Sequence, residues 1–167
     1  NGQNIIESYL WGLIPSWAKD PSIGHKMINA RAETIDKKPS FRSAFKKRRC
    51  IIIVDGFYEW KTDGKKKIPL YFYFKSGEPF GLAGLHESWM SPDQKQVNTC
   101  TIITTDANSL ISSIHDRMPV IIPKELEQTW LKEDIEDKSL LLSLLKPYPA
   151  NEMDYKVGMG PNFTKDK

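Results

Sequence analysis

The chain has 167 residues, 40% of them hydrophobic and 27% charged, and its formal net charge is +3. This length and hydrophobic content suit one domain with one substantial core. No apolar stretch approaches the roughly 20 residues that span a bilayer, no signal-peptide pattern opens the chain, and the two cysteines form no CxxC pair or disulfide framework. We therefore expect a cytoplasmic protein with no membrane association and no metal.

Strands are predicted where β-branched and aromatic residues run between turn signals. The first covers 51–54 and continues into 57–60, and a turn at Asp63-Gly64 joins it to a strand over 68–74 as a hairpin. Further strands are predicted over 80–85, 97–104 and 120–122.

Short helices are predicted over 107–113, over 124–130 after the start signal Pro123, and over 139–145 before Pro147. Strands interleaved with short helices, without a regular strand-helix-strand period, favour an α+β fold with a mostly antiparallel β core and peripheral helices. No repeat, low-complexity segment or linker divides the chain, so residues 1–167 are expected to form a single domain.

Charge is distributed unevenly along the chain. Residues 31–49 hold eight basic side chains against two acidic ones, whereas residues 124–154 hold eight acidic against four basic. This asymmetry suggests that the first half faces a polyanion. An ordinary solvated surface is the alternative, and charge alone does not decide between phosphate contact and solvation.

Three short segments place chemically capable side chains among apolar neighbours: 29–31, 55–60 and 114–119. They offer the amide of Asn29, the carboxylate of Glu59 and the imidazole of His115. Burial between aromatic neighbours would raise the pKa of Glu59 and suit it to general acid-base work. Each also has a plainer interpretation when taken singly: a cap or turn residue, a solvent-facing strand residue, and part of a surface turn.

The two cysteines are expected to serve packing rather than chemistry. Cys50 and Cys100 each lie within a β-branched run that is typical of a buried strand. A free thiol in such a place is usually inert.

Together with the run WGLIPSWAKD at 11–20, the three segments resemble the SOS response-associated peptidase (SRAP) family. The similarity continues in the right order through INARAET, PSFR, RRCIIIVDGFYEW, AGLHESW, TIITTDAN and IHDRMPVII, and so covers nearly the whole chain. The resemblance implies the α+β fold already expected. It also implies a DNA-damage function on single-stranded DNA that holds an abasic site, in the cytoplasm and at the nucleoid if the source is bacterial, without a cofactor.

The implied reaction depends on an N-terminal Cys. Its amine would add to the aldehyde of the ring-opened sugar as an imine, and its thiolate would close on the same carbon as a thiazolidine. Family members begin Met-Cys-Gly-Arg, whereas this sequence begins Asn1-Gly2-Gln3. We expect that a leader with the reactive Cys is missing from the sequence or has been cleaved, and that the chain beginning at Asn1 forms no crosslink.

The resemblance assigns roles to the three candidates. Asn29 would hold the N-terminal amine and the sugar through its amide. Glu59 would move protons during ring opening and imine formation, and His115 would serve the sugar hydroxyl or the adjacent phosphate. These three side chains are therefore predicted to line one cleft.

DNA contacts are implied for four further residues. Arg31 and Arg117 would grip phosphates, Thr104 would donate its hydroxyl to the same backbone, and Trp60 would stack on a nucleobase. Arg117 could instead pair with a carboxylate such as Glu33. Unlike Trp60, the tryptophans Trp17, Trp89 and Trp130 are expected to lie in the core. Segment 155–162 departs from the ending that is usual in the family, so any role of Asn162 stays open.

Three classes of function remain at this point. The first is an abasic-site crosslinking enzyme of lyase type, with self-processing that would release the Cys. The second is a non-catalytic reader of single-stranded or modified DNA, and the third is a peptidase, a hydrolase that acts on proteins. Sequence shows neither an HExxH motif nor a Ser-His-Asp arrangement in support of the third. A monomer is expected.

Overall fold

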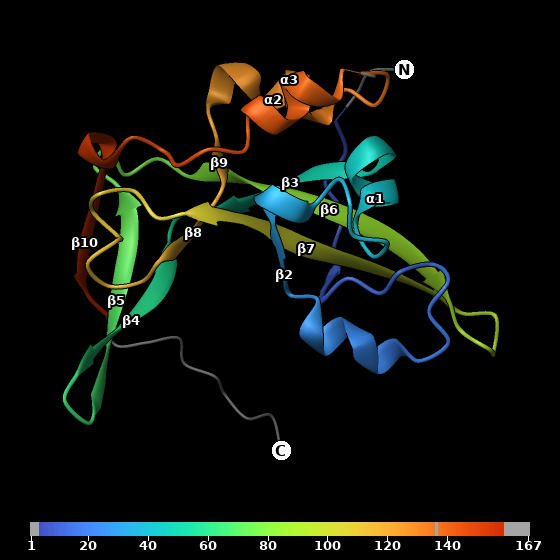
Figure 1. The fold of residues 1–167 in the computed structure, drawn as a ribbon, viewed down its shortest axis with the longest axis horizontal. Coiled ribbons are helices and arrows are strands. Elements are labelled where there is room, and N and C mark those ends of the chain that lie inside the picture. The colour runs from blue at the N-terminus through green and yellow to red at the C-terminus, as the bar shows by residue number, and fades with distance from the viewer. Residues whose placement is uncertain (1–3, 136, 159–167) are drawn as a thin grey trace.

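Two β-sheets organise the part of the chain that the computed structural model describes, residues 4–135 and 137–158 (Figure 1). The larger sheet contains seven strands: β1 (Leu10–Trp11), β2 (Asn29–Arg31), β3 (Arg49–Val54), β6 (Phe80–Met90), β7 (Gln96–Asp106), β8 (Arg117–Pro119) and β9 (Ile121–Ile122). The smaller contains β4 (Phe57–Asp63), β5 (Lys66–Phe74) and β10 (Met153–Val157). The α+β fold expected from the sequence is confirmed.

Most strand pairs are antiparallel, as predicted. The long hairpin β6–β7 forms the centre of the larger sheet, β3 and β9 pair with β6, and β8 pairs with β7. Only β1 and β2, among the described strands, run parallel to their neighbour, and both pair with β7. In the smaller sheet β5 is central between β4 and β10.

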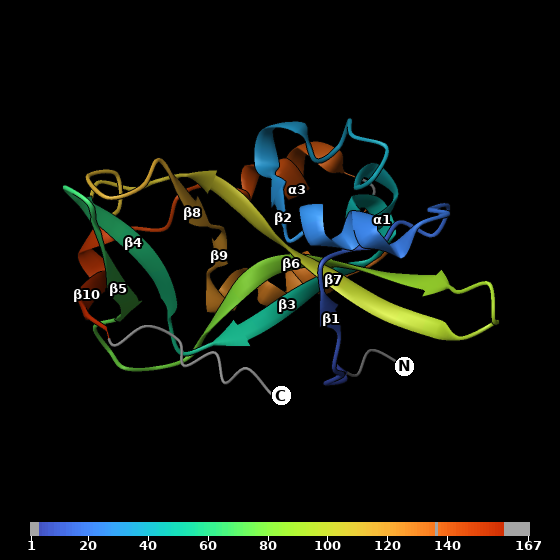
Figure 2. The same cartoon turned by 90° about the horizontal axis from the view of Figure 1, so that it is seen from below.

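Short helices cover the larger sheet and the connections, and Figure 2 shows α1 and α3 near each other and away from β4 and β5. The α-helices are α1 (Arg42–Lys47), α2 (Glu127–Leu131) and α3 (Lys138–Ser143). The 3₁₀ turns are η1 (Pro21–Lys26), η2 (Ala32–Thr34), η3 (Lys124–Leu126) and η4 (Ala150–Glu152). Within the described ranges, no helix is both long enough and apolar enough to span a bilayer.

The apolar core has two parts. One lies between the helices and the larger sheet and includes Phe45, Leu85 and the fully buried Trp130. The other lies where the two sheets meet and includes Phe72 and Met118, both fully buried. Each such side chain contributes roughly 1.5–3 kcal/mol by leaving water, so the smaller sheet is held firmly against the larger one.

The strand predicted to continue from 54 into 57 is divided, because the chain changes sheets there. β3 ends at Val54 and β4 begins at Phe57. A side chain at the intervening Gly56 would collide with the carbonyl of Phe72 and the ring of Tyr71. Glycine therefore permits the close crossing that starts the smaller sheet.

The helix predicted over 107–113 is wrong, since this segment forms irregular turns. The side chain of Asn108 accepts hydrogen bonds from the backbone of Leu110 and Ile111 at 3.1 Å each. Such local bonds compete with a helical ladder. The helices predicted over 124–130 and 139–145 are confirmed as η3 with α2 and as α3, with shifted ends.

The prediction that Trp17 lies in the core is wrong, because this side chain is 60% exposed. Trp89 and Trp130 are buried as predicted. Asn162 lies outside the described residues.

Candidate functional site

Glu59 and His115 line one open pocket of about 510 Å³, together with Trp60, Thr62, Lys67 and Ile114. One wall comes from the β4–β5 hairpin and the other from the turn that leads into β8. The two titratable groups are 56 residues apart in sequence, so only the docking of the smaller sheet brings them together. No cluster of His, Cys, Asp or Glu suited to a metal occurs among residues 4–135 and 137–158.

Strand alternation directs Glu59 into the molecule. Phe57, two residues earlier, faces inward and stacks on Phe72 with ring centroids 5.5 Å apart. Glu59 leaves the strand on the same face as Phe57. Trp60 leaves on the opposite face, where its ring lies 6.3 Å from that of Tyr58 and is 41% exposed. The carboxylate and the indole therefore border the pocket from different faces of β4.

Burial raises the pKa of the Glu59 carboxyl above its ordinary value. The charge of His115 lowers the pKa of Glu59, and the carboxylate of Asp116 raises it further. A carboxyl with a raised pKa retains a proton at higher pH than a solvated one, and so can donate it to a reacting group. Glu59 thus has the property expected of a proton-transfer residue.

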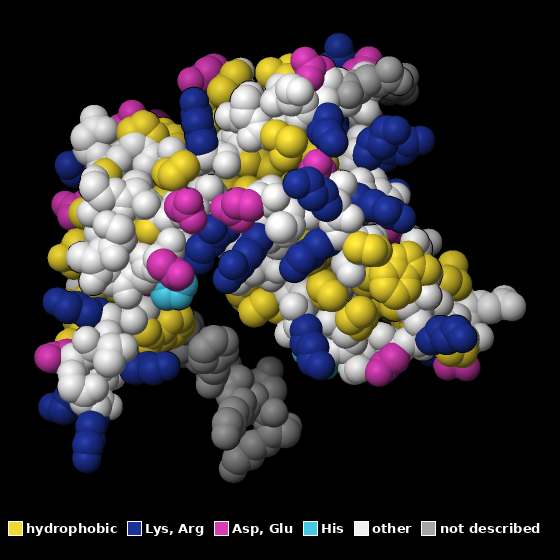
Figure 3. All heavy atoms as spheres, in the orientation of Figure 1, with side chains coloured by type: hydrophobic (Ala, Val, Ile, Leu, Met, Phe, Trp, Pro, Cys, Tyr) yellow, Lys and Arg dark blue, Asp and Glu magenta, His cyan; other side chains and the backbone are white. Residues whose placement is uncertain are grey.

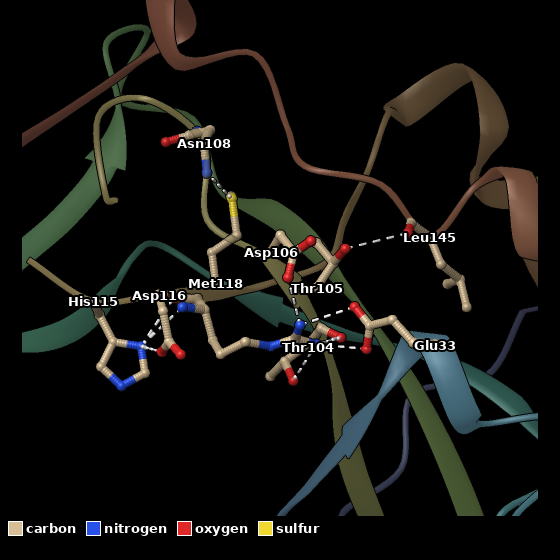
Figure 4. Close-up of polar contacts among 10 residues, drawn as sticks. Glu33, Thr104, Thr105, Asp106, Asn108, His115, Asp116, Met118 and Leu145 are labelled. Carbon is tan, nitrogen blue, oxygen red and sulfur yellow. Dashed lines mark hydrogen bonds and ion pairs between the residues drawn. The ribbon is translucent and has the colours of Figure 1, made fainter. Parts of the chain in front are cut away.

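His115 is held through one ring nitrogen. Its Nδ1 lies 3.0 Å from the backbone nitrogen of Arg117 and 3.4 Å from a carboxylate oxygen of Asp116 (Figure 4). When Nδ1 accepts the Arg117 N–H, the neutral ring carries its proton on Nε2. Nδ1 also lies 3.2 Å from the carbonyl of Arg117. Nε2 points away from the network (Figure 4), so in the tautomer with the proton on Nε2 the imidazole presents a donor to the pocket or to solvent.

Arg117 is bound into the protein by carboxylates. Its two terminal nitrogens donate to Glu33 at 2.8 and 3.0 Å, one of them also donates to Asp106 at 2.8 Å, and the other donates to the carbonyl of Thr104 at 2.7 Å (Figure 4). The side chain is 14% exposed. Its hydrogen bond to Glu33 raises the pKa of Arg117 and lowers that of Glu33. The ion pair with Glu33, left open by the sequence, is therefore present.

Arg31 and Thr104 lie beside each other on adjacent strands. β2 pairs with β7 so that Arg31 is opposite Thr104 and Asn29 is opposite Ile102. Opposite and alternate residues share a face of a sheet, so Asn29, Arg31 and Thr104 project to the same side. Arg117 on β8 lies opposite Asp106 of β7, so its side chain projects to this same side of the sheet.

Arg31 differs from Arg117 in its surroundings. It is exposed and, among the described residues, has no carboxylate within ion-pair distance. Asn29 is also exposed and is not among the residues that line the Glu59–His115 pocket. The structure thus brings Glu59 to His115 and sets Asn29, Arg31 and Thr104 on one sheet face. His115 and Arg117 connect the two groups along the chain.

Neither cysteine contributes to this arrangement. Cys100 is buried, Cys50 is partly buried, and both thiols are free. Burial raises the pKa of Cys50 to about 12 and also raises that of Cys100. Little thiolate exists at neutral pH, so the expected packing role suits both.

Sequence reasoning missed Asp106, Asp116 and Lys67. Asp116 was visible as the neighbour of His115, but its effect on Glu59 follows from the docking of β4. Asp106 could have been found only from the register that sets it opposite Arg117.

Comparison with known proteins points to one family. A family model described as SOS response associated peptidase (SRAP) matches residues 1–158. The abasic site processing protein YoqW of Bacillus subtilis is 52% identical over 165 residues, which cover 98% of this chain and 74% of that protein. The abasic site processing protein HMCES of Xenopus tropicalis is 32% identical, over 78% of this chain and 46% of that protein. A crystal structure from Bacteroides thetaiotaomicron superposes with a TM-score of 0.85 at 40% identity, over 89% of this chain and 67% of that one.

Proposed function

We propose a function from one premise: this chain belongs to the SOS response associated peptidase (SRAP) family. Its relatives are named abasic site processing proteins, and we infer a DNA-damage function at abasic sites for this chain as well. The finer proposal is that it acts on single-stranded DNA and joins the abasic sugar covalently to an N-terminal Cys. The observation that carries it is the meeting of Glu59 and His115 in one open pocket.

The reaction requires one proton transfer to oxygen and one from sulfur. The Cys amine adds to the sugar aldehyde and gives a carbinolamine. Glu59, with its raised pKa, can protonate the hydroxyl of this carbinolamine, which leaves as water, so that an iminium forms and Glu59 becomes a carboxylate. This carboxylate can then take the thiol proton while the sulfur adds to the iminium carbon, and the nitrogen of the thiazolidine ring keeps the hydrogen that it already carries.

DNA binding in this proposal divides among several contacts. Arg31, exposed on β2, would contact a phosphate, with the Thr104 hydroxyl beside it. His115 would donate from Nε2 to a phosphate or sugar oxygen. Asn29 would hold the terminal amine, and Trp60 would stack on a base from the outer face of β4. Arg117 would act on DNA only by exchanging a carboxylate for a phosphate, because its terminal nitrogens are already engaged.

Adduct formation tests the proposal directly. A version that begins Met-Cys-Gly-Arg and is processed to Cys should give an adduct with an abasic oligonucleotide that survives a denaturing gel. The chain beginning at Asn1 is the matched control and should bind the oligonucleotide without forming the adduct. A stable adduct from the control, through Cys50, Cys100 or a lysine, would contradict the assigned nucleophile.

The same pair of proteins separates the alternative functions. A non-catalytic reader would bind DNA equally with and without the terminal Cys and would form no adduct in either case. A peptidase acting on proteins would cleave an unfolded protein substrate, whereas self-processing would appear only as a single turnover in the intact mass of the chain.

A further inference from the structure

A second pocket, of about 450 Å³, lies at the helical end of the molecule. Phe45 and Leu141 form its floor, with the partly buried Ile135 beside them. α1 and α3 border this pocket, whereas β4 and β5 border the Glu59–His115 pocket at the other end in both ribbon views (Figures 1 and 2). The two pockets share no lining residue, so both can be occupied at once.

The rim of this pocket is predominantly basic. Arg42, Lys46 and Lys138 carry positive charge there, against the single carboxylate of Asp36. Asp36 is paired with Lys138 at 3.0 Å. Neither Arg42 nor Lys46 has a carboxylate within ion-pair distance in the described part of the chain. Two cationic side chains thus remain available to a ligand.

The fold separates these two side chains from their basic neighbours in the sequence. Arg49 is 5% exposed and donates to the backbone carbonyls of Phe45, Lys46, Trp130 and Lys132. Arg48 pairs with Glu87 at 2.7 Å. These two arginines are used to hold α1 in place.

Arg42 and Lys46, four residues apart on α1, share one face of the helix. Figure 3 shows Lys and Arg side chains gathered over this region.

We propose that this pocket binds an acidic peptide segment of a partner protein. A bulky apolar side chain of the segment would enter over Phe45 and Leu141, and its carboxylates would pair with Arg42 and Lys46. The apolar floor favours a peptide over a phosphate backbone, because a peptide can cover it with an apolar side chain while its carboxylates meet the two cations. This binding goes beyond the proposed chemistry, since it needs neither Glu59 nor a terminal Cys.

The probe is a fluorescein-labelled ten-residue peptide rich in Asp with two Phe residues, measured by fluorescence anisotropy. It should bind more weakly as salt rises, because its contacts are partly exposed. Replacement of its Asp by Asn, or of its Phe by Ser, should each weaken binding about tenfold or more. Ile135→Ser in the protein should weaken binding of the Phe peptide and leave the weak binding of the Ser peptide unchanged.

A matched pair of variants tests the location. Arg42→Glu with Lys46→Glu should lower the affinity for the peptide at least about tenfold. Lys65→Glu with Lys95→Glu changes the net charge equally at exposed positions that do not line this pocket and should leave the affinity unchanged. If both double variants lost the same affinity for the peptide, net charge alone would explain the effect, and the proposal would be overturned.

Two further outcomes would also overturn it. The first is equal binding of the Phe and Ser peptides, since the apolar floor would then play no part. The second is displacement of the peptide by a single-stranded oligonucleotide together with an equal loss of oligonucleotide binding in the Arg42→Glu, Lys46→Glu variant, which would make this face a nucleic-acid surface. Failure of the adduct assay with intact peptide binding would count against the proposed function alone.

Discussion

His115 and Arg117 stand two residues apart, yet their surroundings differ sharply. The His115 side chain is 46% exposed and is held through one ring nitrogen, whereas Arg117 is 14% exposed and its terminal nitrogens are bound to Glu33, Asp106 and Thr104. A side chain that is held loosely can exchange protons and meet a ligand. A side chain whose two terminal nitrogens are both bound serves first to fix the strands that carry it.

The comparison extends to the two arginines with predicted phosphate contacts. Arg31 is exposed with no carboxylate partner in the described residues, while Arg117 joins β8 to β7 and, through Glu33, to η2. The resemblance to the family assigned both the same role. Their environments predict that Arg31 affects mainly DNA binding and Arg117 mainly stability.

The largest expected effect is on the chemistry at Glu59. In the version with a terminal Cys, Glu59→Gln should slow adduct formation about a hundredfold, because the amide cannot transfer the proton. Time courses on denaturing gels measure the rate. Glu78→Gln, at an exposed position between β5 and β6, is the matched control. A rate within twofold of the parent for Glu59→Gln would place the proton transfer elsewhere.

The next effect is on stability at Arg117. Arg117→Ala should lower the free energy of unfolding by about 2 kcal/mol, because charged hydrogen bonds are lost while the partly exposed carboxylates regain water. Urea denaturation measures this change. Arg31→Ala, the matched control on the same sheet face, should change stability by less than about 0.5 kcal/mol. Equal losses would remove the distinction between the two arginines.

For DNA binding, we expect a larger effect from Arg31→Ala than from Arg117→Ala, the reverse of their effects on stability. Arg31→Ala should weaken binding to single-stranded DNA several-fold across sequences and reduce the slope of log affinity against log salt by about 0.7, the contribution of one phosphate contact on a single strand. Titrations at several salt concentrations provide the slope. If Arg117→Ala changes the slope as much as Arg31→Ala does, Arg117 also meets phosphate. If neither changes it, both act only within the protein.

The smallest effect concerns pH. Burial holds the pKa of Glu59 above its ordinary value, so the folded state retains this proton more tightly than the unfolded state. The resulting stabilisation is present below the ordinary glutamate pKa and is lost as pH rises through the raised value. The amide of Glu59→Gln does not ionise, so this variant loses no stability between the ordinary and the raised pKa. Its free energy of unfolding should therefore rise relative to that of the parent as pH increases through this range. Urea midpoints across a pH series measure the difference, and a constant difference would contradict the burial of this carboxyl.

Much of the fold could be predicted because its signals are local. β-Branched runs marked the strands that became β3, β5, β6 and β7, and Asp63-Gly64 marked the turn of the β4–β5 hairpin. Short or exposed elements carry weaker signals, and β1, β2, α1 and β10 were not predicted. The segment 107–113 had a helical pattern, but side-chain bonds from Asn108 to the backbone prevailed there.

The sequence by itself determined the fold class, the family motifs and the presence of an amide, a carboxylate and an imidazole among apolar neighbours. Only the tertiary structure decided which of these groups meet. Glu33 lies 84 residues before Arg117, and Glu59 lies 56 residues before His115. Periodicity and turn signals describe neighbours along the chain. Ion pairs and pKa values depend instead on strand register and sheet docking, which bring together residues from distant parts of the sequence.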